Sequence, residues 1–350
     1  MAKETNVGIE GKLNVGVIGA GGIARNVHLP SLGDMDDINL VAICDILRER
    51  AAAMAAQYGI PRVYTLYREM FEQETLDAVF VLVEPASLFH VVWQCLDAGL
   101  PTFMEKPPGI TAYQAESLCR KAEEAGQILQ VGFNRRHIPL VRQVVDMVRE
   151  RTQINQVEGC FVKYGNAAFD RGSLTAFLSD TIHAIDLMRW MAGASSDGAE
   201  AEAAALVVTQ YDSPVVNAWN GVCRFDNGVV GTIKANYRTG GRVHTFEVHG
   251  PGVSGYIELG FGGASCNARV LAHQGEARYS LAATGAAQEG ILELDGMELA
   301  GSDQFYRYYG FYQEDRHFLE CVRTGAEPET SIADAVRSMR LAEMFLANVI

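Results

Sequence analysis

The chain has 350 residues, of which 48% are hydrophobic and 21% are charged. This composition is that of a folded globular protein, and the length exceeds what one hydrophobic core usually organises, so we expect two domains with a ligand site in the cleft between them. A formal charge of -14 repels phosphate backbones and anionic lipids, which argues against nucleic acid or a membrane as a partner.

The seven cysteines are scattered, odd in number and without a CxxC pair, so they predict neither a disulfide framework nor a zinc site. No group of His, Cys, Asp or Glu has metal-ligand spacing, and we expect no metal. The leader Met1–Lys12 lacks an apolar signal core, and no stretch approaches the roughly 20 apolar residues of a membrane helix. These features predict a cytoplasmic protein with reduced thiols.

Strands and helices alternate over the first part of the chain. An apolar, β-branched run at 13–18 ends in glycines and leads into a helix at 23–32. The same pattern predicts strands at 39–44, 78–83, 102–104 and 128–132 and helices at 47–58, 88–98 and 112–125. Such alternation is typical of a parallel sheet with right-handed crossovers, and we predict a dinucleotide-binding Rossmann domain over residues 1–133.

The pattern changes after residue 133. It predicts helices at 139–150, 180–191, 312–323 and 332–347, and strands at 156–164, 222–225 and 229–235. The turn Asp226-Asn227-Gly228 between two apolar alternations is a hairpin signal. Residues 134–350 are therefore predicted to form an α+β domain on a largely antiparallel sheet with one open face. The stretch 198–205 is alanine-rich and of low complexity.

The segment Gly19-Ala20-Gly21-Gly22-Ile23-Ala24 fits G-x-G-x-x-G/A between the first strand and its helix. Its glycines allow a tight turn and let backbone N–H groups approach a pyrophosphate at the positive end of the helix. Asp45 ends the next strand, where its carboxylate can accept hydrogen bonds from an adenosine ribose; a helix N-cap before Leu47 is the alternative interpretation. The carboxylate would repel a 2′-phosphate, which favours NAD over NADP, although Arg48 offers a phosphate a partner.

Further motifs resemble the Gfo/Idh/MocA family, the glucose–fructose oxidoreductase and inositol dehydrogenase type. The resemblance spans nearly the whole chain, and a Glu-Lys-Pro triplet is its most specific part. It implies cofactor contacts in the first domain and a homodimer or homotetramer assembled through the open sheet face. The matching positions are Val83-Glu84-Pro85, His90, Gly99, Glu105-Lys106-Pro107, Gly132-Phe133-Asn134-Arg135-Arg136, the helix with His183 and Asp186, and 318–325.

Two residues are the catalytic candidates. A lysine at the carboxyl end of a parallel strand points into the crevice where dinucleotides bind, so Lys106 can donate to a developing alkoxide or carbonyl; a solvated lysine paired with Glu105 is the alternative. His183 corresponds to the family's proton-transfer residue, and histidine is the natural acid/base near neutral pH. The family's usual aspartate is replaced by Ser179, and the carboxylate of Asp180 either orients His183 or caps the helix.

The remaining candidates have weaker support. Asn134 and Arg135 resemble family residues that approach the nicotinamide and the substrate. Pro85, His90 and Glu105 are cofactor-side candidates, and Tyr164, Arg171 and Ser179 are substrate-side candidates. His28 and Asp186 are interpreted as structural residues, and the aromatic run at 305–312 as a sugar platform, a core or a subunit interface.

These observations predict an NAD(P)-dependent oxidoreductase that transfers a hydride between nicotinamide and a secondary alcohol or ketone of a sugar, polyol or sugar derivative. Two alternatives remain. One is an NAD-dependent glycoside hydrolase with transient oxidation, which the altered position at Ser179 keeps open. The other is a non-catalytic NAD-binding regulator, against which the retention of Lys106 and His183 argues.

Overall fold

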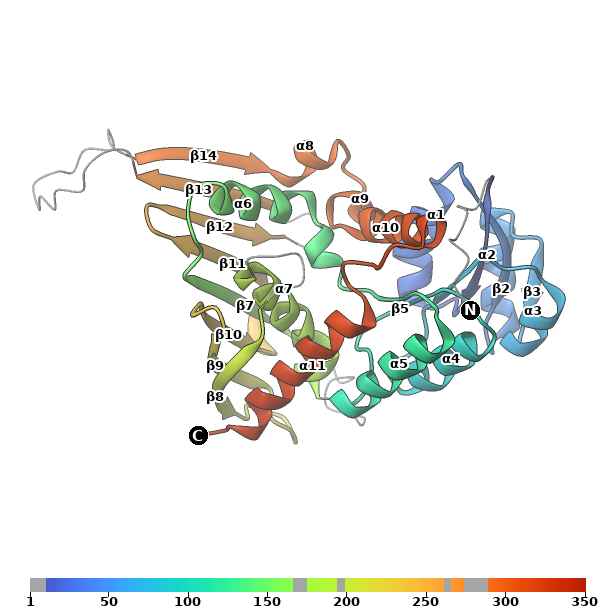
Figure 1. Ribbon diagram of the computed structural model, residues 1–350, viewed down its shortest axis with the longest axis horizontal. Coiled ribbons are helices and arrows are strands. Elements are labelled where there is room, and N and C mark those ends of the chain that lie inside the picture. Colours follow the sequence, from blue (N-terminus) through green and yellow to red (C-terminus); the bar gives the residue numbers. More distant parts are fainter. Residues whose placement is uncertain (1–10, 166–174, 194–198, 261–265, 274–288) are drawn as a thin grey trace, which may run out of the picture. The chain divides into compact units, whose positions relative to one another are not determined.

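The computed structural model describes residues 11–165, 175–193, 199–260, 266–273 and 289–350, so most of the leader Met1–Lys12 lies outside the described part. The chain divides into two compact units (Figure 1). Unit 1 comprises Met1–His137 and Gln304–Arg340, and unit 2 comprises Ile138–Asp303 and Leu341–Ile350. Within the described residues, the helices are too short or too polar to cross a bilayer.

Unit 1 is built on a six-stranded sheet with the order β3-β2-β1-β4-β5-β6, in which every neighbouring pair is parallel. The predicted Rossmann sheet is confirmed. Strands β1, β4, β5 and β6 are almost wholly buried, as expected for a parallel sheet with helices on both faces, whereas β2 and β3 are partly exposed. The strands are β1 (Leu13–Ile18), β2 (Ile38–Cys44), β3 (Arg62–Tyr64), β4 (Ala78–Val81), β5 (Thr102–Met104) and β6 (Leu129–Val131).

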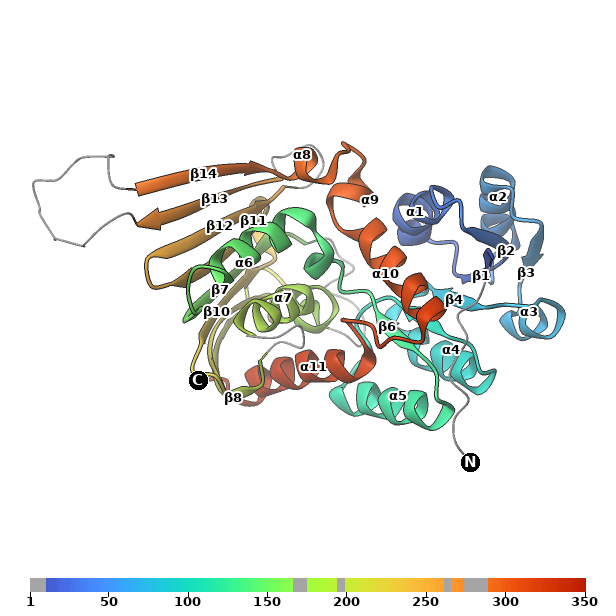
Figure 2. The ribbon, with the colours of Figure 1, turned by 45° about the horizontal axis from the view of Figure 1, so that its top comes forward.

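Helices cover both faces of this sheet. Figures 1 and 2 show α4 and α5 on one side and α1 with α10 on the other. Three helices of unit 1 end at a left-handed glycine, Gly59 after α2, Gly126 after α5 and Gly325 after α10. The sequence predicts the first two of these ends. The helices of unit 1 are α1 (Leu29–Gly33), α2 (Arg48–Tyr58), α3 (Tyr67–Gln73), α4 (Pro85–Asp97), α5 (Ala112–Ala125), α9 (Phe305–Tyr308), α10 (Phe311–Thr324) and the first part of α11 (Ile332–Ala347).

The segment Gln304–Arg340 lies with the parallel sheet, whereas the sequence boundary between residues 133 and 134 places it with the second domain. The reason is apolar packing by α10. Phe318 and Leu319 are fully buried in the same hydrophobic cluster as β1 and α1, and the Phe318 ring lies 5.3 Å from that of Phe80. The core of unit 1 is therefore completed by a distant part of the chain.

Unit 2 is built on an eight-stranded sheet with the order β14-β13-β12-β11-β7-β10-β9-β8. All neighbouring pairs are antiparallel except β7 with β10, so the predicted largely antiparallel sheet is confirmed. The predicted hairpin joins β9 to β10, and Gly228 in its turn has φ +84°. The strands are β7 (Gln156–Tyr164), β8 (Ala201–Thr209), β9 (Ala218–Phe225), β10 (Val230–Asn236), β11 (Arg238–Gly250), β12 (Val253–Leu259), β13 (Cys266–His273) and β14 (Glu289–Asp295).

Helices α6 (Pro139–Arg149) and α7 (Ile182–Ala192) cover one face of this sheet (Figure 2). A short helix, α8 (Gly296–Ala300), follows β14, and unit 2 resumes within α11 at Leu341. The opposite face carries exposed side chains such as Val222 and Tyr256, and no described helix of unit 2 packs on it. This is the open face predicted from the sequence.

Candidate active site

The candidate residues of unit 1 follow the carboxyl ends of five parallel strands. Gly19 comes directly after β1, Asp45 after β2, Pro85 after β4, Lys106 after β5 and Asn134 after β6. Neighbouring parallel strands end at one edge of the sheet, and ligands of open α/β sheets bind outside that edge. The fold therefore brings together side chains that are widely separated in sequence.

The glycine turn after β1 requires glycine for two separate reasons. Gly19 has φ +104°, and a Cβ there would lie 2.4 Å from the carbonyl oxygen of Leu82. At Gly21 and Gly22 a Cβ would meet no atom within 4 Å, so these glycines leave open space beside exposed backbone. This is the cradle that a pyrophosphate needs at the start of a helix.

The helix after the glycine turn contains a π-helical turn, η1 (Ala24–His28), before α1. The Leu29 N–H donates to the carbonyl of Ala24, five residues back. Pro30 follows, and its ring lacks an N–H and crowds the preceding turn of a regular α-helix, which the wider turn accommodates. His28 is fully buried at the end of this turn.

Asp45 lies against the glycine turn. Its Oδ2 accepts the Ala20 N–H at 2.8 Å, and its Oδ1 accepts the Leu47 N–H at 2.8 Å. Helix α2 has Leu47 at its N-cap and no side-chain cap, so Asp45 stands two residues before the cap. Arg48 is the exposed first residue of α2, and its guanidinium lies 3.5 Å from the Val63 carbonyl oxygen.

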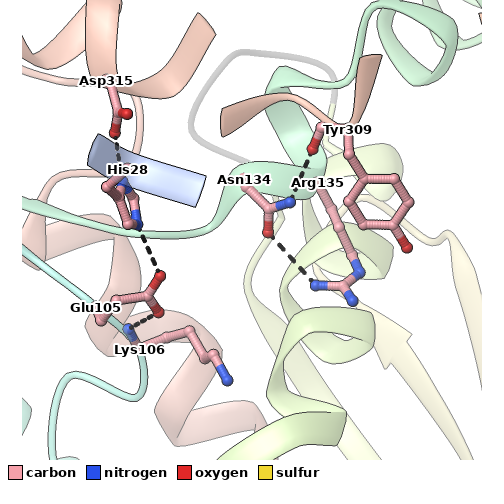
Figure 3. A network of polar contacts seen from close by, with 7 residues as sticks. All are labelled: His28, Glu105, Lys106, Asn134, Arg135, Tyr309 and Asp315. Carbon is pink, nitrogen blue, oxygen red and sulfur yellow. Dashed lines mark hydrogen bonds and ion pairs between the residues drawn. The ribbon is translucent and has the colours of Figure 1, made fainter. Parts of the chain in front are cut away.

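Glu105 and Lys106 follow β5, and the Lys106–Pro107 peptide bond is cis. The Glu105 carboxylate is buried, and its Oε2 accepts the backbone N–H of Lys106 at 3.1 Å. Figure 3 shows the Lys106 side chain extending away from His28, with its ammonium at the far end. Glu105 thus contacts the backbone of the lysine that it precedes.

His28 is the centre of a buried polar network (Figure 3). Its Nε2 lies 3.1 Å from Glu105 Oε1, and its Nδ1 lies 2.9 Å from Asp315 Oδ1 in α10. Burial alone lowers the pKa of His28, but the two carboxylates more than offset this and raise that pKa well above its usual 6.5. Burial likewise disfavours the charged Glu105, yet the bond from His28 holds the pKa of Glu105 below its usual value.

Glu314 lies beside this network, fully buried in α10. Neither carboxylate oxygen has a hydrogen-bond partner among the described residues. Burial, together with the charge of Asp315, raises the pKa of Glu314 well above its usual value. Burial therefore favours the protonated, uncharged form of Glu314. The sequence indicates neither Glu314 nor Asp315 as a site residue.

Asn134 and Arg135 begin a short 3-10 turn, η2 (Asn134–His137), and both are buried. The Asn134 amide donates to the Tyr309 carbonyl at 2.9 Å, and its Oδ1 lies 3.5 Å from an Arg135 nitrogen (Figure 3). The Arg135 guanidinium is 5.9 Å from the centre of the Tyr309 ring. Of the aromatic run at 305–312, Tyr308, Tyr309 and Phe311 are buried within unit 1, which makes this part of the run a core element.

Two cofactor candidates lie on α4. Pro85 is its first residue and is partly buried, where a proline suits the helix because no intrahelical N–H is needed. His90 is exposed in the second turn, with its ring 5.8 Å from that of Phe89. His90 therefore lies within α4.

In unit 2, His183 is buried in the first turn of α7. Ser179 and Asp180 precede it in a π-helical turn, η3 (Phe177–Thr181). The Asp180 carboxylate contacts the Lys163 ammonium and accepts the Tyr237 hydroxyl at 2.9 Å. The N-cap of α7 is Thr181, so Asp180 joins the helix to β7 and to the end of β10 and does not cap it.

The other unit 2 candidates are placed as follows. The Ser179 hydroxyl donates to the Thr175 carbonyl at 3.0 Å. Tyr164 ends β7, 69% exposed, with the Arg238 guanidinium 5.6 Å from its ring centre. Asp186 is fully buried in α7, as expected of a structural residue. Arg171 lies outside the described residues.

Two groups of described residues have ligand atoms close enough to hold a metal ion, His28 with Glu314 and Asp315, and Glu158 with Glu247 and His249. In the first group both imidazole nitrogens already face carboxylates. The second group lies partly exposed on the sheet of unit 2. All seven cysteines lie in the described residues, and none is in a disulfide.

Two family models match the chain. Residues 13–133 match a model described as "Oxidoreductase family, NAD-binding Rossmann fold", and residues 154–253 match the GFO/IDH/MocA C-terminal domain. Together the two matches span more than half of the chain.

Several known proteins are similar to it. A myo-inositol 2-dehydrogenase of Thermotoga maritima is 28% identical over 237 residues, which cover 65% of this chain and 69% of that protein. A scyllo-inositol 2-dehydrogenase (NAD(+)) of Bacillus subtilis is 24% identical over 348 residues, covering 95% of this chain and 93% of that protein. The crystal structure of a dehydrogenase from Chromobacterium violaceum has the same fold, with a TM-score of 0.80 at 22% identity over 96% of this chain and 95% of that one.

Proposed function

Because the chain belongs to the GFO/IDH/MocA family of oxidoreductases, we propose that it is an NAD-dependent dehydrogenase acting on a secondary alcohol or ketone of a sugar, polyol or sugar derivative. Its first domain is an NAD-binding Rossmann fold, which confirms the cofactor predicted from the sequence. The two inositol dehydrogenases similar to the chain support the substrate class and do not favour the glycoside hydrolase alternative.

The observation that carries this proposal is the edge of the parallel sheet, where the glycine turn, Asp45 and Lys106 follow β1, β2 and β5. The residues fit a dinucleotide, since Gly21 and Gly22 leave open space at the start of a helix. Two backbone N–H groups hold the Asp45 carboxylate in place. The fixed Asp45 carboxylate can accept hydrogen bonds from ribose hydroxyls and would repel a 2′-phosphate. We therefore propose NAD in preference to NADP.

The bound NAD would supply the hydride acceptor for the oxidation. Lys106 would donate a hydrogen bond to the substrate oxygen and stabilise its developing charge, while His183 would take the hydroxyl proton. Asn134, Pro85 and His90 are proposed cofactor contacts, and Arg135 is a proposed substrate contact. Asp180 is bound to Lys163 and Tyr237 and would fix the start of the helix that carries His183.

The open sheet face of unit 2 supports a further proposal, a homodimer or homotetramer assembled through it. Exposed apolar side chains on this face include Val207 and Val222, which line a hollow that spans several strands. Covering exposed apolar surface is favourable. The free cysteines fit a reducing compartment, and we propose that the protein is cytoplasmic.

The test is absorbance at 340 nm with NAD or NADP and a panel of inositols, aldoses, sugar acids and aminosugars. We expect NADH to accumulate with one compound class and NAD. The Lys106→Met variant should lose about 100-fold or more in turnover, because the developing oxyanion loses its donor. Lys12→Met, at an exposed position before β1, is the matched control and should keep wild-type turnover. Near-normal turnover in Lys106→Met would refute the assigned role.

A further inference from the structure

His28 lies where three segments of unit 1 meet. It ends the π-helical turn that follows the glycine turn, and its ring nitrogens face one carboxylate after β5 and another in α10. The Phe103 and Phe311 rings pack edge-on against the imidazole at 5.2 and 5.7 Å. Apolar rings on its faces and carboxylates at its nitrogens leave the imidazole a single orientation.

The hydrogen-bond pattern fixes the charge of this imidazole. An ionised carboxylate only accepts hydrogen bonds, so both ring nitrogens must donate, and only the imidazolium has two N–H groups. The groups that face His28 are Glu105 from the end of β5 and Asp315 and Glu314 from α10. The imidazolium lies between the Glu105 and Asp315 carboxylates, and such charge-assisted hydrogen bonds are the strong ones.

The network continues from His28 to the lysine. Glu105 uses one carboxylate oxygen for His28 and the other for the Lys106 backbone N–H. The Glu105 N–H donates to the Val81 carbonyl at 3.1 Å, which ties the same residue to β4. Two prolines follow Lys106, so no further N–H is available there to hold the backbone. The Glu105 carboxylate is therefore a main anchor of the segment that carries Lys106.

We propose that His28 is a positioning residue for Lys106, acting through Glu105 while Asp315 holds the imidazole in its doubly donating form. The catalytic consequence of this inference rests on the proposed function, in which Lys106 contacts the substrate. The inference goes beyond the interpretation of His28 as a structural residue. The arrangement follows the logic by which a buried aspartate orients a histidine in catalytic triads, one step removed from the reacting atoms.

The pH dependence has a defined sign. The raised pKa of His28 means that its contribution to stability is fully present below the unfolded value of 6.5 and is lost as pH rises through the higher folded value. The Asp315→Asn variant loses the charge of Asp315, which is the largest contribution that raises the pKa of His28. Burial then lowers the pKa of His28 relative to the wild type. The imidazolium is then lost at a lower pH than in the wild type, and with it the anchor on Lys106.

The first readout is hydrogen–deuterium exchange of the NAD-bound protein, followed in the peptide from Thr102 to Gly109, in which Lys106 lies beyond the first two residues that lose their label. Its two prolines have no amide hydrogen, so the exchange of the Lys106 amide is resolved among only a few amide hydrogens. In Asp315→Asn at about pH 9, we expect the Lys106 amide to exchange about 10-fold or more faster than in the wild type at the same pH, with near wild-type protection at about pH 6. This readout does not need a substrate.

The second readout is turnover with the substrate that the panel identifies. In Asp315→Asn, kcat should fall about 10- to 100-fold between about pH 6 and about pH 9 relative to the wild type, with a much smaller change in KM. Asp37→Asn is the matched control, because Asp37 pairs with Arg316 and Arg323 of the same helix without contacting His28. It should keep the wild-type exchange rate and pH profile.

Each outcome is decisive. Wild-type exchange and pH profile in folded Asp315→Asn would overturn the positioning role, as would identical changes in Asp37→Asn. If Asp315→Asn does not fold, Glu105→Gln is measured in the same way, and an unchanged Lys106 amide would overturn the role. If the wild type turns over no panel compound, the proposed function fails, and the exchange readout still tests the positioning role.

Discussion

Gly19 and Gly21 stand two residues apart in one turn but serve different ends. Gly19 has a positive φ, and its Cα faces the Leu82 carbonyl at the end of β4, so glycine is needed for the fold. Gly21 faces open space, so glycine there is needed only for what approaches from outside. One sequence motif thus combines a structural requirement with a binding requirement.

These two positions should separate in a denaturation experiment. Gly19→Ala should lower the free energy of unfolding without NAD by about 3 kcal/mol, because the methyl group collides with backbone at a strained φ. Gly21→Ala should change that free energy by less than about 0.5 kcal/mol but weaken NAD binding about 10-fold or more. Urea unfolding without cofactor and calorimetric NAD titration measure the two effects. Equal destabilisation by both changes would contradict this account.

At the residue scale, the sequence predicts well the side chains that belong to local motifs. The glycine turn, Asp45 and Lys106 each follow a recognisable strand, and the structure puts them at one edge of the sheet. The partners of His28 are different, because Asp315 is 287 residues away and Glu314 carries no motif. Only the packing of α10 brings these carboxylates to the histidine, and nothing in the local sequence encodes that contact.

At the element scale, prediction succeeds where a repeat is long or a terminator is strong. The helix at 112–125, with Gly126 after it, and the strand at 156–164 agree with α5 and β7 at both ends. The sequence pattern does not predict β3 and α3, since three strand residues are too few to show a period. Within the stretch at 198–205, which is of low complexity in sequence, residues 201–205 belong to β8. The neighbouring strand β9 supplies hydrogen bonds that offset the weak β preference of alanine.

The hairpin between β9 and β10 gives a testable case at this scale. Gly228 has φ +84°, and a Cβ at this position would meet no atom within 4 Å, so only backbone strain opposes substitution. Gly228→Val should cost about 2 kcal/mol in the free energy of unfolding, and Gly228→Asn about half of that, since Asn tolerates this region better. Gly240→Val in β11, which meets no neighbour either and lacks a positive φ, is the control. Equal stability of the two valine variants would refute the argument.

At the scale of the whole molecule, the sheet of unit 2 has one face covered by α6 and α7 and one face exposing apolar side chains. Val222 on β9 is 46% exposed and lines the hollow over the central strands. An antiparallel sheet can leave one face to water, but exposed apolar side chains on that face favour its covering by another chain. The proposed homo-oligomer follows from this face.

Light scattering at micromolar concentration tests the oligomer. We expect the wild type to be a dimer or tetramer and Val222→Glu to shift the mass toward the monomer, because a buried unpaired carboxylate is costly at an interface. Tyr113→Glu is the control, since Tyr113 is 71% exposed on α5 in the other unit. A monomeric wild type would refute the assembly, and an unchanged mass for Val222→Glu would place the interface elsewhere.

The two-segment composition of unit 1 has a consequence during protein synthesis. When the ribosome has made the first 137 residues, all six strands of the parallel sheet exist, but Phe318, Leu319 and Val322 of its hydrophobic cluster do not. One face of the nascent sheet stays partly bare until the first segment of unit 2, Ile138–Asp303, and then α10 have emerged. Early domains usually fold first on the ribosome. Here the N-terminal domain is completed only after most of unit 2 has been made, so the nascent chain must keep that face from aggregating in the meantime.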